Sequence, residues 1–245
     1  MAFLNFFRKN RSGGEPFFPF RTDIHSHILP GIDDGSPNIE TSLELIRGLM
    51  KLGVRRSVAT PHVIGDMYRN TPDTILGALT LLQEALVREG MEFEVSAAAE
   101  YMLDAYFLEL LADKKVLLTV SGNLLLTEFS YSTMPTNPEK MSFAIITEGF
   151  TPILAHPERY AYYYRNFREY HRLKELGFLL QVNLLSLTGY YGREALKASQ
   201  YLLKNGLVTF LGTDLHHANH MAALNDPRNQ DIFREFLSGR EWNVL

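Results

Sequence analysis

The 245-residue sequence contains no cysteine. This absence excludes disulfide bonds, thiolate-bound metal ions and catalysis by a cysteine nucleophile. The sequence also lacks an apolar run of the roughly 20 residues that a membrane-spanning helix needs. Lysine and arginine together number 24 against 28 aspartates and glutamates, so no basic excess indicates a nucleic-acid partner. We therefore expect neither an integral membrane segment nor a nucleic-acid partner, and any hydrolysis must use another nucleophile.

No stretch rich in proline, glycine and serine divides the chain, and it has no internal repeat. We expect residues 1–14 to form a flexible tail and residues 15–245 to form a single domain. At the start of the chain the apolar residues precede the basic ones, which is the reverse of the order in a signal peptide. The sequence therefore favours a cytoplasmic protein.

Short apolar segments alternate with longer helical patterns. The strands are predicted at 21–25, 57–60, 94–99, 124–128, 152–155, 178–183 and 207–213, and the helices near 37–51, 72–89, 103–112, 138–148, 167–176, 191–204 and 228–238. This alternation predicts parallel strands with helical crossovers, and its size favours a (β/α) barrel over an open sheet. Ser36 is the predicted N-cap of the first helix, with Pro37 at its first position. Gly53, Gly177 and Gly206 are expected to follow helix ends.

Six of the seven predicted strands are followed by side chains that can bind metal. Carboxyl ends of barrel strands are where active sites are built. Each residue also has a structural explanation, since Glu100 could cap a helix and Asp214 could occupy a turn. Their shared position after the strands favours a metal site. The candidates are His25, His27, His62, Glu100, Glu128, His156, Asp214 and His216.

One further candidate comes from the neighbouring pair Asp33 and Asp34, which follows the first strand. The set then holds five imidazoles and four carboxylates without sulfur, which suits manganese, iron or zinc. Nine ligands are too many for one ion, and carboxylates bridge ions, so two or three metals are expected. Cations would also relieve the repulsion between the clustered carboxylates.

The segments that carry these residues resemble a known family. They read "DIHSHILPGIDDG", "TPH", "AAEYML", "LLTEFS", "AHPERY" and "GTDLHH". They look like the PHP (polymerase and histidinol phosphatase) superfamily, and are most similar to its bacterial manganese-dependent tyrosine-protein phosphatases of the CpsB/YwqE type. The likeness extends from about residue 21 to residue 224. It implies an α/β fold, a distorted (β/α)7 TIM-like PHP barrel holding up to three ions, Mn²⁺ with Fe or Zn as alternatives.

The resemblance also implies how the ligands are shared. One ion would be held by His25, His27, Glu100 and Asp214, a second by Glu100, Glu128 and His156, and a third by Asp34, His62 and His216. Spacing from His25 favours Asp34, with Asp33 as the alternative, and Asp23 is expected to orient a ligand.

Arg159 matches the family's phosphate-binding arginine and is expected to be catalytic together with Glu100 and His156. A guanidinium offers a fork of donors suited to a phosphoryl group. The structural alternatives are a salt bridge to Glu158 or a charge at the start of a helix. Related sequences usually carry a second arginine after "GTDLHH", where this chain has Asn219 and His220. Arg159 therefore acts alone, a histidine replaces the missing arginine, or phosphate affinity is reduced.

The implied activity is that of a metal-dependent phosphoric monoester hydrolase, a protein-tyrosine phosphatase in which metal-activated hydroxide attacks phosphotyrosine. The implied partner is the tail of a membrane tyrosine kinase linked to capsular or exopolysaccharide synthesis, reached at the inner face of the membrane. One alternative is a small-molecule phosphomonoesterase of the histidinol-phosphatase kind. Another is a non-catalytic metal-stabilised binding module, which the complete ligand set argues against.

The tyrosines that follow Arg159 and the pair Tyr190 and Tyr191 have two explanations. Most are expected to pack in the fold, while one or two could line the mouth of the site. His171, His217 and His220 are not assigned as ligands, and His171 is expected on a helix surface.

Overall fold

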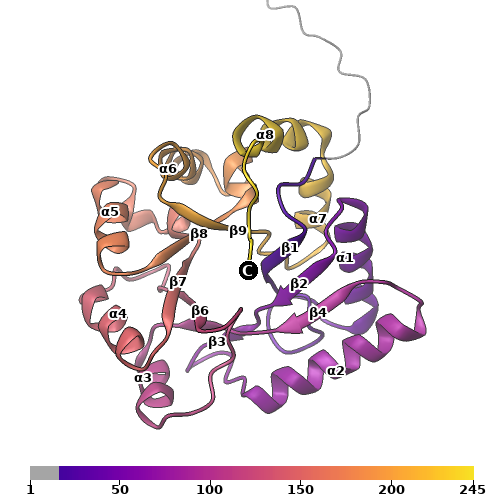
Figure 1. The fold of residues 1–245 in the computed structure, drawn as a ribbon, viewed down its shortest axis with the longest axis horizontal. Helices are drawn as coiled ribbons and strands as arrows, with labels where there is room; N and C mark the ends of the chain where they lie inside the picture. Colours follow the sequence, from indigo (N-terminus) through magenta and orange to yellow (C-terminus); the bar gives the residue numbers. More distant parts are fainter. Residues whose placement is uncertain (1–16) are drawn as a thin grey trace, which may run out of the picture.

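The computed structural model describes residues 17–245, and its parallel strands form a central ring inside a ring of helices (Figure 1). The predicted tail, residues 1–14, lies outside the described residues. The strands are β1 (Thr22–Ser26), β2 (Arg56–Ala59), β3 (His62–Val63), β4 (Glu94–Ala97), β5 (Glu100–Met102), β6 (Leu124–Glu128), β7 (Thr151–Ala155), β8 (Leu179–Asn183) and β9 (Val208–Gly212). The helices are α1 (Ile39–Lys51), α2 (Pro72–Arg88), α3 (Ala105–Ala112), α4 (Pro138–Thr147), α5 (Arg168–Glu175), α6 (Arg193–Lys204), α7 (Ala218–Asn225) and α8 (Pro227–Leu237).

Two of the predicted strands are followed by a short further strand outside the predicted bounds. β2 is followed by β3 across Pro61, and β4 is followed by β5. β1, β2 and β4 form one sheet, and β3, β5, β6, β7, β8 and β9 form the other. A proline has no N–H for a strand ladder, which accounts for the break between β2 and β3. The Ala98 N–H still donates to the Ala59 carbonyl (2.8 Å), and the Glu100 N–H to the Pro61 carbonyl (3.0 Å). The predicted distorted seven-position barrel is therefore confirmed, with strand breaks as the distortion.

The ring closes between β1 and the segment that follows β9. The Asp214 N–H donates to the His25 carbonyl (2.8 Å), and the His27 N–H donates to the Leu215 carbonyl (2.9 Å). Asp23 accepts hydrogen bonds from the backbone N–H and the hydroxyl of Thr213. Asp23 also accepts the N–H of His25 at 3.4 Å, so it contacts the backbone next to two candidate ligands, and its expected role in orienting a ligand stays a prediction.

Two layers of apolar side chains fill the molecule. The larger lies between the strands and the helices, where α1 buries Leu43, Ile46 and Leu49 at helical spacing. The smaller cluster is enclosed by the ring, and its buried members are Ile24, Val58, Ala98, Val120, Leu126, Ile153, Ala155 and Phe210. The ring is thus packed under the carboxyl ends of its strands, and the space for a site lies above that packing.

The start of α1 corrects a sequence prediction. Asn38 is the N-cap, because its side-chain oxygen accepts the N–H of Thr41 at 2.9 Å. Ser36 instead donates its hydroxyl to the Asn38 carbonyl (3.0 Å), and Pro37 precedes the helix. α7 was not predicted, since its eight residues have no clear apolar periodicity.

The predicted helix ends are confirmed. Gly53, Gly177 and Gly206 come directly after the C-caps of α1, α5 and α6 and have left-handed φ angles of 90°, 94° and 65°.

The chain ends over the centre of the ring, at the end where the strands begin (Figure 1). The Asn243 amide donates to the carbonyls of Thr22 and Leu211, both at 2.9 Å, and thereby bridges β1 and β9. Trp242 is buried beside it. None of the helices within residues 17–245 combines the length and apolar character needed to cross a bilayer.

Candidate metal centre

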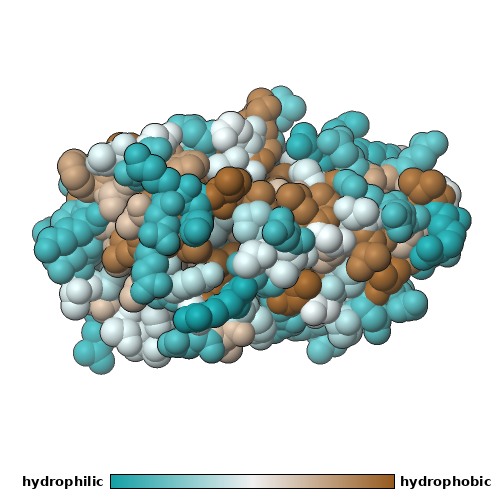
Figure 2. Space-filling model, turned by 90° about the horizontal axis from the view of Figure 1, so that it is seen from below, coloured by the Kyte–Doolittle hydropathy of each residue, from teal (hydrophilic) through white to brown (hydrophobic). Residues whose placement is uncertain are grey.

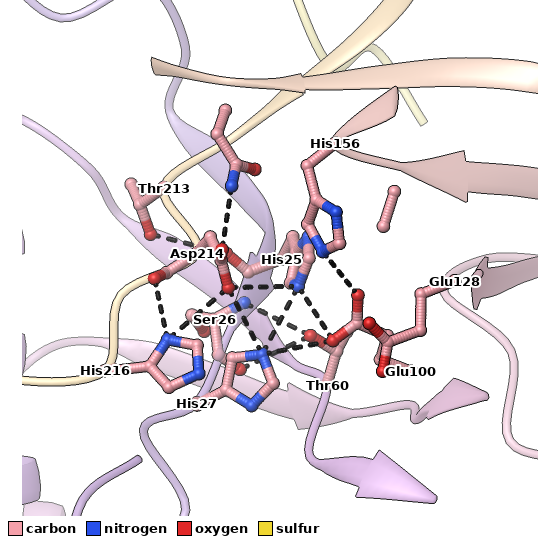
Figure 3. Close-up of polar contacts among 12 residues, drawn as sticks. His25, Ser26, His27, Thr60, Glu100, Glu128, His156, Thr213, Asp214 and His216 are labelled. Carbon is pink, nitrogen blue, oxygen red and sulfur yellow. Dashed lines mark hydrogen bonds and ion pairs between the residues drawn. The ribbon is translucent and has the colours of Figure 1, made fainter. Parts of the chain in front are cut away.

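The nine predicted ligands converge at the carboxyl end of the strands. Figure 3 shows side chains from β1, β5, β6 and the segments after β7 and β9 pointing toward one another. Their ligand atoms fall into four overlapping groups in which all atoms lie within 4.8 Å of one another. The groups are His27, Asp34, His62 and His216; His25, His27 and Glu100; His25, His156 and Asp214; and His62, Glu100 and Glu128.

An irregularity in β1 turns the His25 imidazole toward the centre, and His27 follows directly after this strand. Ile24 belongs to the apolar cluster inside the ring, and the next residue, His25, also faces the centre. The pairing of β1 with β2 shifts register between Asp23 and Ser26, and such bulges redirect side chains. A Cβ at position 212 would lie 2.8 Å from the Cβ of His25, so Gly212 leaves the space that this imidazole needs.

Glu100 lies in the middle of the cluster. Its Oε2 is 3.3 Å from His25 Nε2, 3.4 Å from His27 Nε2 and 3.2 Å from His62 Nδ1. Its Oε1 is 3.0 Å from His156 Nε2. One fully buried carboxylate thus faces four imidazoles, which is the position of a group that bridges ions.

The two neighbouring aspartates have different surroundings. Asp34 Oδ1 lies 3.5 Å from Nε2 of both His62 and His216. Asp33 Oδ2 lies 2.7 Å from His27 Nδ1, and its other oxygen accepts the N–H of Gly35 (3.0 Å). This geometry supports Asp34 as the ligand and gives Asp33 the task of orienting His27.

The grouping of ligands differs in part from the one that the resemblance implied. His62 lies with Glu100 and Glu128, since its Nδ1 is 3.0 Å from Glu128 Oε1. His156 lies with His25 and Asp214 rather than with Glu128. The same nine residues are present, but the distances divide them among ions in more than one way.

Three buried atoms of the cluster indicate whether it can accommodate cations. Glu100 Oε2, Glu128 Oε1 and His62 Nδ1 have no partner of hydrogen-bonding geometry among the described residues. A buried polar atom without a partner is costly, and a buried charge more so. Divalent ions bound by nitrogen and oxygen ligands would satisfy all three atoms, so the residues fit the metals that the sequence predicts.

Burial and mutual repulsion leave protons in the metal-free cluster. Burial and the charge of Glu100 raise the pKa of Glu128 to about 7. Burial opposes the charging of His25, but Glu100 and Asp214 outweigh it and raise its pKa to about 9. Burial lowers the pKa of His156 to about 4, which keeps this imidazole neutral and ready to bind metal.

We expect the stabilisation by bound metal to increase with pH. Folding raises the pKa of His25 from 6.5 to about 9 and that of Glu128 from 4.5 to about 7, so the metal-free fold binds extra protons and loses stability as pH rises through these ranges. Metal needs the deprotonated groups and binds more tightly at high pH. The difference in Tm between Mn²⁺-loaded and chelated protein should be larger at about pH 8.5 than at about pH 6, measured by calorimetry. If this difference in Tm stayed constant or became smaller at the higher pH, the assignment of His25 and Glu128 as metal ligands would be contradicted.

Arg159 lies beside the cluster in an aromatic sandwich. Its Nη1 donates to Asp214 Oδ2 at 2.6 Å. Its guanidinium lies over the rings of Tyr131 (4.9 Å) and Tyr191 (4.2 Å), where cation–π attraction holds it. The alternative salt bridge to Glu158 is wrong, because Glu158 instead accepts the Asn183 N–H and the Ser186 hydroxyl.

A pocket of about 290 Å³ opens above the cluster. The Arg159 side chain is 23% exposed and makes no further hydrogen bond among residues 17–245, so donors remain for a ligand. The pocket is lined by Asp34, His62, Tyr131, His156, Arg159, Asp214, His216, His217 and His220. Arg159 thus reaches the same space as the predicted ligands.

Two further histidines, His217 and His220, line the pocket, and His220 stands in the stretch where the resemblance led us to expect a second arginine. His217 caps α7, and its Nδ1 accepts the His220 N–H at 3.4 Å. His220 Nδ1 lies 3.1 Å from the Asp214 carbonyl, and burial lowers its pKa to about 4. Burial therefore disfavours the charged form of His220, whereas the guanidinium of Arg159 is always charged. His171 lies outside the pocket, on α5, with Nε2 3.0 Å from the Tyr201 hydroxyl.

The tyrosines divide between packing and the pocket. Tyr160 and Tyr163 are buried, as the packing explanation predicted. Tyr191 contacts Arg159, in agreement with a tyrosine near the mouth. Tyr131 was not singled out from the sequence, although its hydroxyl lies 3.2 Å from His156 Nδ1. Nothing in the pattern around it distinguishes it from a surface tyrosine.

Two amides of β8 support the centre and were also missed. Gln181 Oε1 lies 2.8 Å from His25 Nδ1. The Gln181 amide donates to Asn183 Oδ1 (2.9 Å), and the Asn183 amide donates to Asp214 Oδ2 (2.7 Å). This chain fixes the orientation of a histidine and an aspartate. The polar residues at alternate positions of "FLLQVN" were the available signal, since alternate residues share one face of a strand.

Two of the candidate ligands have left-handed backbone conformations. The φ angles are 34° at His156 and 51° at Asp214, values that are uncommon for residues other than glycine. His156 follows β7 directly, and Asp214 lies two residues after the end of β9. Such strain persists where the surroundings enforce it, and it is concentrated at functional sites.

Comparison with known proteins extends these observations. The sequence profile described as "Capsular polysaccharide synthesis, CpsB/CapC" matches residues 21–229. The tyrosine-protein phosphatase YwqE of Bacillus subtilis is 30% identical over 195 residues, covering 80% of this chain and 77% of its own. The tyrosine-protein phosphatase CpsB of Streptococcus pneumoniae is 29% identical over 202 residues, covering 80% and 82%.

Solved structures agree with the sequence relatives. A crystal structure from a study of YwqE and CpsB as metal-dependent tyrosine phosphatases superposes with a TM-score of 0.79 at 28% identity, covering 89% of this chain and 88% of its own. Histidinol phosphate phosphatase of Lactococcus lactis superposes with a TM-score of 0.54 at 13% identity, covering 92% and 94%, which shows a shared fold. The chain belongs to the CpsB/CapC family of capsular polysaccharide synthesis, as its motifs predicted.

Proposed function

We propose that this chain is a metal-dependent protein-tyrosine phosphatase that acts in capsular polysaccharide synthesis. The family match and the phosphatase relatives support this activity. The observation that carries the proposal is the cluster of nine nitrogen- and oxygen-bearing ligands, most of them buried, next to an accessible arginine. Metal ions and a guanidinium in one pocket are the groups that a phosphoryl transfer needs.

The proposed metal ligands are the nine residues predicted from the sequence. When bound, divalent ions supply the acidity that makes water a nucleophile at neutral pH and the positive charge that stabilises the phosphoryl group. Glu100 lies between the groups of ligands and would bridge ions. Gln181, Asn183 and Asp33 hold their neighbours in the orientation that binding requires.

Arg159 would bind the phosphoryl oxygens. Its side chain enters the pocket with one edge fixed on Asp214 and its faces covered by Tyr131 and Tyr191. A guanidinium held in advance loses little freedom when it binds phosphate, and its charge counters the charge that develops during attack. The tyrosine hydroxyl has a pKa of about 10, so its phenolate is a better leaving group than an alkoxide.

We further propose Mn²⁺ as the metal and the tyrosine-rich tail of a membrane kinase as the substrate, met at the cytoplasmic face of the membrane. Imidazole and carboxylate ligands accept manganese, and they also accept iron and zinc. The family's connection with capsule synthesis supports a substrate in polysaccharide export.

The activity is tested with the purified chain on a phosphotyrosyl peptide and on histidinol phosphate. We expect hydrolysis of the peptide, loss of at least about 10³-fold in turnover after chelation, and recovery with Mn²⁺. Iron and zinc are returned in parallel, with metal content measured for each sample. Faster hydrolysis of histidinol phosphate would favour a small-molecule phosphatase, and no turnover with any metal would favour a binding module.

A further inference from the structure

The loop between β6 and α4, residues 129–137, separates the metal pocket from a second hollow. Tyr131 lines the metal pocket, while Phe129, Ser130 and Met134 line a neighbouring space of about 400 Å³. The base of the loop is fixed, because the Phe129 N–H donates to the Tyr160 hydroxyl (2.9 Å) and the Tyr162 hydroxyl donates to the Ser130 carbonyl (3.1 Å). The two spaces thus share one anchored wall.

This second space, here termed the apolar groove, is lined largely by hydrophobic side chains. Its lining residues are Leu103, Leu108, Phe129, Ser130, Thr133, Met134, Pro135, Thr136, Asn137, Lys140 and Met141. Leu108 and Met134 remain 37% and 46% exposed. Methionine side chains adapt to different partners, and Lys140 is the one charged group among these residues. The groove therefore suits an apolar side chain of a bound polypeptide that carries no positive charge.

Apolar surface continues from the groove along α4. Lys140 also lines a hollow with Phe143 and Ile146, which are 72% and 46% exposed. On the side of the molecule formed by α2 and α3, apolar residues likewise interrupt the polar surface (Figure 2). Large exposed apolar groups that are contiguous mark interaction sites more often than scattered ones do. The apolar groups of the groove and α4 begin beside Tyr131, at the edge of the metal pocket.

We propose that the apolar groove binds the polypeptide that flanks the substrate phosphotyrosine, by receiving an apolar side chain a few residues away from it. This inference rests on the proposed phosphatase function. A phosphotyrosine that enters the metal pocket brings its own backbone to the pocket rim, where Tyr131 lies. Extended chain advances about 3.3 Å per residue, so a few residues cross the loop into the groove.

The apolar groove would discriminate among phosphotyrosyl sequences, which the metal pocket alone cannot do. Metal ligands and Arg159 recognise the phosphoryl group, which every phosphotyrosyl sequence carries. Apolar contacts with Leu108 and Met134 depend on the neighbouring residues instead. A second copy of this chain is the competing occupant, and it would place the groove in a dimer interface.

The test compares three substrates: free phosphotyrosine, a phosphotyrosyl peptide with leucines on both sides, and the same peptide with serines instead. For the unaltered chain with Mn²⁺, we expect kcat/KM for the leucine peptide to exceed that for the serine peptide about five- to tenfold, the value of one partly buried apolar side chain. The substitutions Leu108→Gln and Met134→Gln are expected to remove most of this preference. Neither should change kcat/KM for free phosphotyrosine more than about twofold.

Val87→Gln provides the matched control, because Val87 is 81% exposed on α2 and does not line the groove. It is expected to keep the preference. An unaltered chain that hydrolyses both peptides equally overturns the inference, as do groove variants that retain the preference. A change from dimer to monomer in the variants, with the preference intact, assigns the groove to a second copy. Absence of phosphotyrosine hydrolysis by the unaltered chain would instead contradict the proposed function itself.

Discussion

Replacing Glu100 with alanine is expected to lower kcat at least about 10³-fold while the fold persists. Glu100 is the carboxylate that faces four imidazoles, from His25, His27, His62 and His156. Burial opposes its charge, but His25 and His62 outweigh burial and hold its pKa well below the usual value. It is thus a permanent anion, and without it the histidines lose the charge that would hold ions among them. Steady-state kinetics with saturating Mn²⁺ measure the effect.

Two variants make this result specific. Glu100→Gln keeps the volume and removes the charge, so it should lose nearly as much activity as the alanine variant. Glu109→Ala removes an exposed carboxylate from α3 and should leave turnover unchanged. Circular dichroism and metal analysis accompany each protein. Near-normal turnover of Glu100→Ala would show that this carboxylate has no part in the reaction.

Replacing Arg159 with methionine is expected to lower kcat/KM about 10²- to 10³-fold and to weaken inhibition by inorganic phosphate in parallel. Methionine retains some of the packing between Tyr131 and Tyr191 but cannot donate to a phosphoryl oxygen. Lysine keeps the charge without the fork of donors, so Arg159→Lys should recover only part of the loss. Initial rates and phosphate inhibition constants measure both effects.

Arg159 also donates to Asp214, so a purely supporting role must be separated from phosphate binding. If Arg159 only positioned Asp214, the methionine variant would lose metal while its phosphate inhibition constant, measured with excess Mn²⁺, stayed the same. That result would remove Arg159 from the substrate site. Arg172→Met, which alters an arginine on the surface of α5 that is 49% exposed, should change neither quantity.

Much of the fold could be predicted from local patterns in the sequence. Apolar segments followed by helical segments predicted the barrel, because each strand must bury both faces and each helix one. The candidate ligands could also be identified from the sequence, since His25, Glu128 and His156 end or directly follow predicted strands. The prediction of β-strand ends was enough to place them on one rim, where the structure brings their ligand atoms together.

Contacts between distant segments decided the details. Spacing from His25 favoured Asp34 over Asp33, but only the fold shows that Asp34 faces His62 and His216 while Asp33 faces His27. The same holds for the cap of α1, because both Ser36 and Asn38 have a suitable side chain.

The sequence by itself determined which atoms are available for chemistry: imidazoles and carboxylates without thiols, spaced to follow successive strands. Only the tertiary structure decided how these atoms are shared, that Gln181 and Asn183 support them, and that Tyr131 and Tyr191 enclose Arg159. The reason is physical. The type of a side chain and the period of a pattern are local properties, whereas a distance of a few ångströms between residues far apart in the chain exists only after the barrel has closed.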